Sequence, residues 1–163
     1  MIFLFHHTDI SHLIAELHDP TIKKRRTAAT QLGKTCNLSA IPALIDALSD
    51  THPLVRCDIV QALGRLGDSS AVPELIVCLD DTNVEVRAAA IAAIGRIKDR
   101  DGVDPLIKCL CDKEIIIRIG AAEVLGKLGD RRAIEPLKKL GHDPFSDVRE
   151  AAAEAIRRLL VRS

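Results

Sequence analysis

Apolar residues recur along the chain in two alternating patterns. Segment 71–79 has them at positions i, i+3, i+4 and i+7, which is the buried stripe of a short helix. The preceding segment 54–66 has apolar residues at the same helical spacing over a greater length. Gly64 and Gly67 are expected to end this second helix. Asp68 is placed to initiate the following turn, so the pattern predicts paired helices, a short one followed by a longer one.

The helix pair repeats every 31 residues without insertion or deletion. An Asp keeps this interval at Asp19, Asp50, Asp81, Asp112 and Asp143, and an Arg keeps it at Arg25, Arg56, Arg87, Arg118 and Arg149. A strict period of this length is typical of a stack of supersecondary units. The sequence therefore predicts one all-α solenoid domain over 1–163, with five antiparallel helix pairs at about 8–33, 38–64, 69–95, 100–126 and 131–161.

The composition narrows the classes of partner. The 163 residues include 23 Lys and Arg against 23 Asp and Glu, so bulk attraction to nucleic acid or to an anionic membrane is not expected. Trp and Tyr are absent, which leaves few aromatic platforms on which bases could stack. No stretch approaches the length of a membrane span. These features favour another protein or a peptide as the partner.

The five cysteines predict neither disulfides nor a reactive site. Their number is odd and no C-x-x-C motif occurs, while Cys78 and Cys109 stand one repeat apart at a position that Ala47 also fills. This pattern predicts small buried residues, a reducing compartment and a cytoplasmic location. Cys57 has no His one helical turn away, so no catalytic residue is predicted.

Metal ligands and cofactor motifs are similarly sparse. Cys109-x-Cys111 does not have the spacing of a structural zinc site. His6, His7 and His12 with Asp9 could at most form an adventitious site near the N-terminus. There is no glycine-rich phosphate loop, so neither a metal nor a cofactor is predicted.

The repeat is clearest in Val55-Arg56, Leu63-Gly64-Arg65-Leu66-Gly67-Asp68 and Ala71-Val72-Pro73. This unit resembles the short HEAT-like repeat of phycobilin lyase subunits and of many small bacterial and archaeal proteins. The resemblance covers essentially the whole chain and implies a right-handed solenoid whose concave face is lined by the second helix of each pair. It also implies that the repeating Arg and Asp residues form a structural ladder between neighbouring units.

The second helix of each pair has a side that points away from its apolar stripe. In the second unit, Leu54, Asp58, Gln61 and Arg65 lie on it at spacings of 4, 3 and 4 residues. A cation recurs at the last of these positions, as Lys34, Arg65, Arg96, Lys127 and Arg158. The row has two interpretations: a basic rail for an acidic peptide or a phosphate backbone, or cations favoured by the dipole at each helix end.

The sequence thus favours a non-catalytic protein–protein interaction scaffold that binds its partner on the second helices. Leu54 and Ile116 are candidate apolar anchors, since both interrupt an otherwise polar side. The full candidate set is Leu54, Asp58, Gln61, Arg65, Glu85, Arg96, Ile116, Glu123, Lys127, Glu154 and Arg158. Two alternatives stay open: an accessory or lyase-type subunit for a tetrapyrrole chromophore, implied by the resemblance alone, and a weak nucleic-acid binder that uses the basic row.

Overall fold

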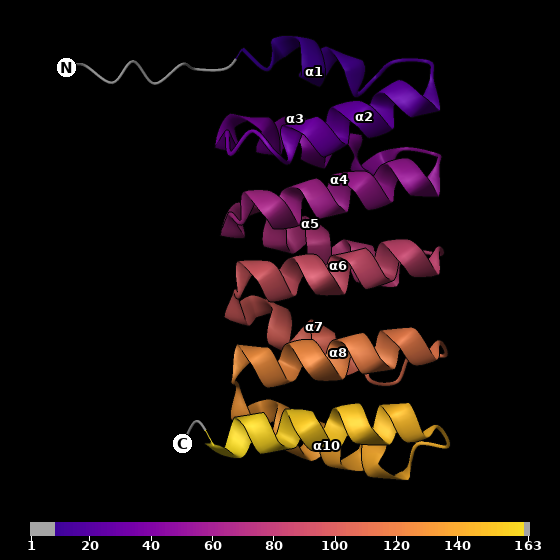
Figure 1. Cartoon of the computed structure of the whole chain (residues 1–163), viewed down its shortest axis with the longest axis vertical. Helices are drawn as coiled ribbons and strands as arrows, with labels where there is room; N and C mark the ends of the chain where they lie inside the picture. Colours follow the sequence, from indigo (N-terminus) through magenta and orange to yellow (C-terminus); the bar gives the residue numbers. More distant parts are fainter. Residues whose placement is uncertain (1–8, 162–163) are drawn as a thin grey trace, which may run out of the picture.

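Residues 9–161 are described in a computed structural model of the chain, and within them the only regular secondary structure is helical. The first helices of the pairs are α1 (Ser11–Glu16), α3 (Ile41–Asp46), α5 (Val72–Val77), α7 (Val103–Cys109) and α9 (Ile134–Lys139). The second are α2 (Ile22–Leu32), α4 (Pro53–Leu66), α6 (Val84–Ile97), α8 (Ile115–Leu128) and α10 (Ser146–Val161). Figure 1 shows the even-numbered helices side by side in one layer with the odd-numbered helices behind them. The chain is therefore an α-solenoid.

The odd-numbered helices have six or seven residues, and 3-10 turns precede α3, α5, α7 and α9 and follow α3, α5 and α9. The turns before them are η1 (Leu38–Ala40), η3 (Ser69–Ala71), η5 (Arg100–Gly102) and η6 (Arg131–Ala133), and those after them are η2 (Ala47–Ser49), η4 (Cys78–Asp80) and η7 (Leu140–His142). The Asp68 carboxylate accepts the Ser70 N–H at 2.9 Å, and Asn37, Asp99 and Asp130 make the same contact. The predicted turn-initiating role of Asp68 is confirmed.

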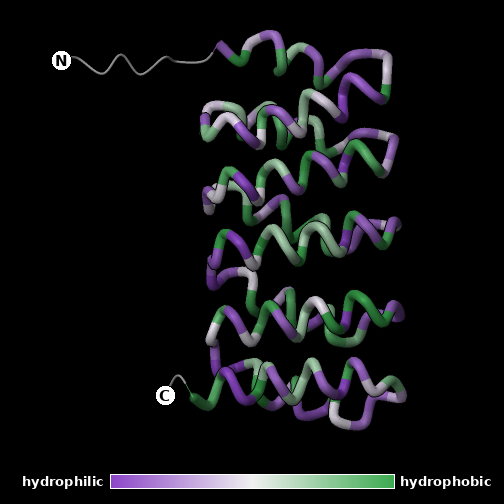
Figure 2. The backbone as a smooth tube through the Cα atoms, in the orientation of Figure 1, coloured by the Kyte–Doolittle hydropathy of each residue, from purple (hydrophilic) through white to green (hydrophobic). Residues whose placement is uncertain are grey.

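One hydrophobic core runs through the stack between the two layers. Leu44, Ile59, Leu63 and Leu75 are among the fully buried side chains at its centre. Figure 2 shows hydrophilic residues gathered at the turns and long apolar stretches in α6 and α8. The stack buries Cys78 and Cys109 to 9% exposure each, as their repeat position predicts, and all five cysteines are free thiols.

The repeating glycine, at Gly33, Gly64, Gly95 and Gly126, allows neighbouring even-numbered helices to pack closely. Gly64 lies inside α4, so the prediction that it ends the helix is wrong, whereas the same prediction for Gly67 is confirmed, since Gly67 caps the helix with a φ of 74° in the left-handed region. A Cβ atom on Gly64 would lie 2.7 Å from the Cβ of Ala93 on α6. Gly33, Gly95 and Gly126 face the next even helix in the same way. The repeating glycine therefore permits close approach of neighbouring helices; Gly64, Gly95 and Gly126 lie inside their helices, and only Gly33 stands at a helix end, as the C-cap of α2.

Candidate interaction surface

Four arginines join neighbouring units through bidentate ion pairs. The Arg56 Nε and Nη2 atoms donate to the Asp81 carboxylate of the next unit, both at 2.8 Å, and its Nη1 donates to the Asp50 carbonyl at 2.8 Å. The same pattern joins Arg25 to Asp50, Arg87 to Asp112 and Arg118 to Asp143. Each guanidinium thus fixes the turn of its own unit and holds the turn of the following one.

The two ends of this ladder differ from its interior. Each bond runs from an Arg to the Asp of the following unit, so Asp19 has no preceding Arg and pairs with Lys24 at 3.1 Å. Arg149 has no following Asp within residues 9–161 and donates only to the Asp143 and Pro144 carbonyls. The expectation that all ten residues pair with one another therefore holds for eight of them, and Asp19 and Arg149 are the exceptions.

The ladder is partly buried, which strengthens its charge pairing. Arg87 is 6% exposed and Arg118 is 8% exposed. Hydrogen bonds from the Arg56 guanidinium hold the pKa of Asp81 below its ordinary value, and those from Arg118 do the same for Asp143. Because these charged groups satisfy one another, the ladder leaves few of them to bind a partner. A partner would have to use other residues.

All eleven candidate residues lie on even-numbered helices, and most are exposed. Leu54 is 43% exposed on α4 and Ile116 is 61% exposed on α8. Asp58 is half-buried and pairs with Arg26 of α2 at 2.7 Å, while the Gln61 amide donates to the Cys57 Sγ at 3.4 Å. The exposed members are Leu54, Gln61, Arg65, Glu85, Arg96, Ile116, Glu123, Lys127 and Arg158. The outward side of the even helices, here called the even face, is therefore accessible along its length.

The cations of the repeating row fall into two groups. Lys127 lies 4.0 Å from Glu123 and Arg158 lies 2.9 Å from Glu154, so each pairs with an acid four residues earlier on its own helix. Lys34, Arg65 and Arg96 make no ion pair within residues 9–161. The residues four positions before them are Thr30, Gln61 and Ala92, none of which is charged. The unpaired positive charge therefore lies over α2, α4 and α6.

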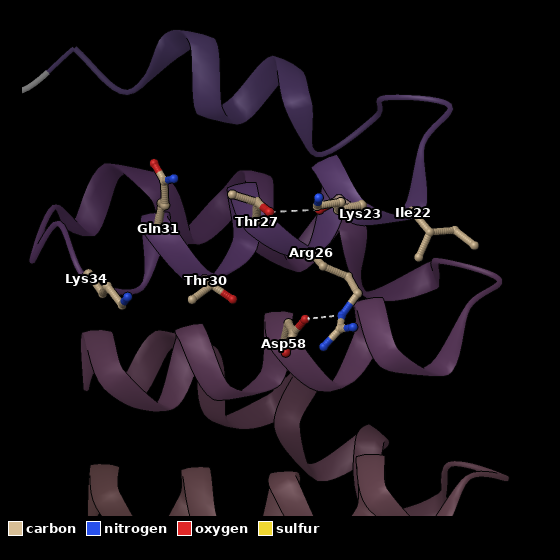
Figure 3. A pocket seen from close by; sticks show the side chains of 8 residues that line it. All are labelled: Ile22, Lys23, Arg26, Thr27, Thr30, Gln31, Lys34 and Asp58. Carbon is tan, nitrogen blue, oxygen red and sulfur yellow. Dashed lines mark hydrogen bonds and ion pairs between the residues drawn. The ribbon is translucent and has the colours of Figure 1, made fainter.

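A hollow of about 540 Å³ opens on the even face beside Lys34. It lies along α2 and reaches α4, as Figure 3 shows. The Thr27 hydroxyl donates to the Lys23 carbonyl at 2.9 Å, so its oxygen lone pairs remain available as acceptors. The lining residues are Ile22, Lys23, Arg26, Thr27, Thr30, Gln31, Lys34 and Asp58. The lining contains three cations, Lys23, Arg26 and Lys34, and one acid, Asp58, which pairs with Arg26. The hollow therefore has a net positive charge.

A second hollow of about 300 Å³ lies between α4 and α6. Its floor is made of small residues, and Gly64 approaches Ala93 of α6 closely there. Arg65 and Arg96 line it from the two helices. The remaining lining residues are Gln61, Gly64, Ala89, Ala92 and Ala93. A hollow with two arginines and a floor of small residues is suited to an extended peptide segment that carries acidic side chains.

The even face changes character over α8 and α10. A third hollow of about 530 Å³ there contains four acids, Glu123, Asp147, Glu150 and Glu154. Its cations Lys127, Arg157 and Arg158 pair with Glu123 or Glu154. The candidate set predicted from the sequence contained four of the five row cations without distinguishing them, and it omitted Lys34 as well as Lys23 and Arg26. The residue four positions before each cation is the signal that separates the two groups.

Residues 9–161 contain no group of three or more His, Cys, Asp or Glu side chains arranged to hold a metal ion. Burial raises the pKa of Cys57, and it raises those of Cys78 and Cys109 to about 11, which disfavours the thiolates. His6, His7 and the apolar segment 1–5 lie outside the described residues. None of the described helices has the length and apolar character needed to cross a membrane.

Comparisons with known structures identify similar repeat proteins. A chain in the complex of CpcE and CpcF of phycocyanin lyase from Nostoc sp. PCC7120 is 29% identical, with a TM-score of 0.80 over 98% of this chain and 70% of that one. A designed armadillo repeat protein in complex with the peptide (KR)4 is 20% identical, with a TM-score of 0.66 over 92% and 81% of the two chains. No curated protein sequence matches the chain.

A family model described as HEAT repeats matches the sequence itself. Its two matches cover residues 10–83 and 72–157, which together include nearly all of the described chain. The match agrees with the stacked helix pairs and with the similarity to the phycocyanin lyase chain. The protein belongs to the HEAT repeat family.

Proposed function

We propose that the protein is a non-catalytic interaction module that binds an acidic segment of a partner protein on the even face over α2, α4 and α6. The observation that carries this proposal is the row of Lys34, Arg65 and Arg96, which are exposed and have no ion pair within residues 9–161. Exposed cations without partners attract carboxylates and do not first have to break an existing pair. The small-residue floor between α4 and α6 supports the same location.

The spacing of the helices suggests the form of the bound segment. Neighbouring packed helices lie about 8–10 Å apart, and an extended chain advances about 3.3 Å per residue. An extended peptide that crosses the even face would therefore meet successive cations at about every third residue. A peptide with Glu at every third position is the simplest probe that fits this geometry.

The proposal is tested by fluorescence anisotropy with such a labelled peptide. The double variant Arg65→Glu/Arg96→Glu should weaken binding by more than about tenfold and reduce its salt dependence, because it reverses two attractive charges. The matched control is Arg100→Glu/Arg131→Glu, which makes the same charge change at exposed sites on η5 and η6. Equal loss in the two double variants would show that only net charge matters and would overturn the proposal.

Two exposed apolar residues would add to the contact, Leu54 on α4 within this site and Ile116 on α8 beside it. Leu54 and Ile116 are exposed, so replacing both with Ala should leave the melting temperature unchanged. A protein partner that uses these anchors should bind the variant less tightly, whereas a simple acidic peptide should not distinguish it from the original chain. Loss of thermal stability in the variant would instead show that the two side chains support the fold.

The similarity to the phycocyanin lyase chain favours a second candidate, an accessory or lyase-type subunit that handles a linear tetrapyrrole. The carboxylates of such a chromophore could use the same cations. This candidate predicts a change in the absorbance spectrum when the protein is mixed with a linear tetrapyrrole, and a smaller change for Arg65→Glu/Arg96→Glu. An unchanged spectrum would leave the peptide-binding proposal as the better account. Salt-dependent binding of single-stranded DNA in place of the peptide would favour the nucleic-acid alternative.

A further inference from the structure

A hollow of about 600 Å³ lies between α3 and α5, in the layer of odd-numbered helices (Figure 1). Residues of both helices and of the turns η2 and η4 line it. Four of the lining residues are apolar, namely Ile45, Leu48, Val77 and Cys78. No Lys or Arg is among the lining residues, in contrast to the hollows over α2, α4 and α6. This α3–α5 hollow is therefore a different kind of surface from the basic part of the even face.

Val77 is the most exposed of these apolar residues. It is 73% exposed, whereas the other three are at least half-buried. The equivalent positions in the other units hold the small Ala15 and three charged residues, Asp46, Lys108 and Lys139. All four are exposed. The repeat therefore folds without an apolar side chain at this position, and packing of the stack does not account for Val77.

Two carboxylates flank Val77 along the chain. Glu74 stands three residues before it and Asp80 three residues after it, and both line the hollow. Neither makes an ion pair within residues 9–161, whereas the third acid of the lining, Asp81, pairs with Arg56. No other unit has an acid at either of the two flanking positions. This unit alone thus combines an exposed apolar side chain with two unpaired carboxylates.

The combination selects among classes of occupant. An exposed apolar side chain is stabilised when a second apolar side chain covers it, and unpaired carboxylates attract Lys and Arg. The carboxylates would repel a phosphate backbone, an acidic peptide and the carboxylates of a linear tetrapyrrole. A protein segment with one bulky apolar residue between two cations satisfies both parts of the site.

The spacing of the three side chains sets the spacing of such a segment. An α-helix rises about 1.5 Å per residue and a 3-10 turn about 2.0 Å, so each carboxylate lies roughly 4.5–6 Å from Val77 along the axis of α5 and η4. Side chains two residues apart in an extended peptide point to the same side and lie about 6.6 Å apart. An extended segment with the order cation, any residue, apolar residue, any residue, cation therefore matches Glu74, Val77 and Asp80.

We propose that the α3–α5 hollow docks an extended segment of a partner protein in which one bulky apolar residue stands between two Lys or Arg residues. The apolar side chain covers Val77 and packs on Ile45 and Leu48, while the two cations pair with Glu74 and Asp80. Charge complementarity is the argument for this occupant, because the lining supplies two unpaired acids and no cation. The site lies outside the even face, so it is a second binding surface beyond the proposed function.

The probe is a labelled Gly-Arg-Ser-Leu-Ser-Arg-Gly peptide, whose binding to the full-length chain is followed by fluorescence anisotropy. Val77→Lys should weaken binding at least about tenfold, because it replaces the apolar contact with a charge that repels the peptide. The variant is expected to fold, since Lys108 and Lys139 occupy the equivalent positions. Val77→Ser combined with Ser in place of the peptide Leu should cost little more than either change alone, because both remove one contact.

The acids are tested by a second double variant. Glu74→Gln/Asp80→Asn should weaken binding at least about threefold and reduce its salt dependence, because the peptide loses both ion pairs. The matched control is Asp101→Asn/Glu135→Gln, which removes two exposed acids on η5 and α9. This control should change binding less than about twofold, since neither acid lines the hollow.

Four results would overturn the proposal. Two are the absence of saturable binding and a loss in the control as large as that in the variant of the two lining acids. The third is tighter binding by Phe3→Ser/Phe5→Ser, which would make segment 1–5 of this chain the occupant. The fourth is self-association that Val77→Lys abolishes, which would make a second copy the occupant. Val77→Ser should leave binding of the acidic peptide to the even face unchanged, so this docking surface and the proposed function succeed or fail separately.

Discussion

Gly64 and Ala93 lie at the closest approach between α4 and α6, where an added Cβ on Gly64 would lie 2.7 Å from the Ala93 Cβ and 2.8 Å from its Cα. Gly64→Ala should destabilise the fold by about 1–3 kcal/mol, because the helices must separate to accept the methyl group. Gly120→Ala on α8 is the matched control. Its added Cβ would meet only the Ile91 side chain at 3.7 Å.

The control should be neutral, or stabilising by up to about 1 kcal/mol, because Ala favours a helix more than Gly does. Urea denaturation of the two variants gives the comparison directly. A Gly64→Ala protein as stable as Gly120→Ala would show that the helices yield easily and that the glycine is not needed for packing.

Arg87 and Arg96 lie on the same helix, α6, but have different surroundings. Arg87 is 6% exposed, pairs with Asp112 at 3.0 Å and donates to two carbonyls, whereas Arg96 is exposed and makes no ion pair within residues 9–161. Arg87→Ala should cost about 1–3 kcal/mol of unfolding free energy, because the Asp112 carboxylate loses its partner. Arg96→Ala should change it by less than about 0.5 kcal/mol. Equal shifts in chemical denaturation would contradict the division between structural and binding cations.

The ladder should make stability depend on acid pH. Hydrogen bonds from Arg56 hold the folded-state pKa of Asp81 below its ordinary value, so the stabilisation is complete above the unfolded value of about 3.9 and is lost as pH falls through the folded value. Asp81→Asn should be less stable than the original chain at pH 7 and lose less stability between about pH 5 and pH 2. Arg56→Ala should flatten the same curve. Unchanged slopes in urea titrations across this range would refute the prediction.

Thiol reactivity should follow burial. Cys36 is exposed in a turn, whereas burial raises the pKa values of Cys78 and Cys109 to about 11. Brief alkylation near neutral pH should therefore label Cys36 before either buried thiol. Mass spectrometry of the peptides reports the order, and early modification of Cys78 would show that α5 and η4 open more readily than their packing indicates.

The sequence predicted the repeat well because the features that define it are local and periodic. The apolar stripes and the Asp68 turn follow from helical spacing and short-range hydrogen bonding. The role of Gly64 was misjudged because a helix-ending glycine and a close-approach glycine look alike until the neighbouring helix is placed. Gly67, three residues later, is the one that adopts a positive φ.

The candidate surface was predicted in part for a related reason. The even-face positions followed from helical spacing, but the state of each cation depends on what lies nearby. Lys127 is paired with Glu123, and the Arg26 pair with Asp58 crosses from α2 to α4. A pair within one helix, such as Lys127 with Glu123, can be predicted from the residue four positions earlier. A pair between two helices, such as Arg26 with Asp58, depends on how the two units pack, and the pattern of a single helix does not contain this information.

Backbone amide chemical-shift mapping shows where on the protein an acidic peptide binds. The ¹⁵N-labelled protein is titrated with the peptide that has Glu at every third position. The largest shifts should fall in segments 23–34, 54–65 and 85–96, around Lys34, Arg65 and Arg96, while α9 and α10 change little. Largest shifts on the odd-numbered helices, or shifts centred on α10, would show that the peptide does not bind over α2, α4 and α6.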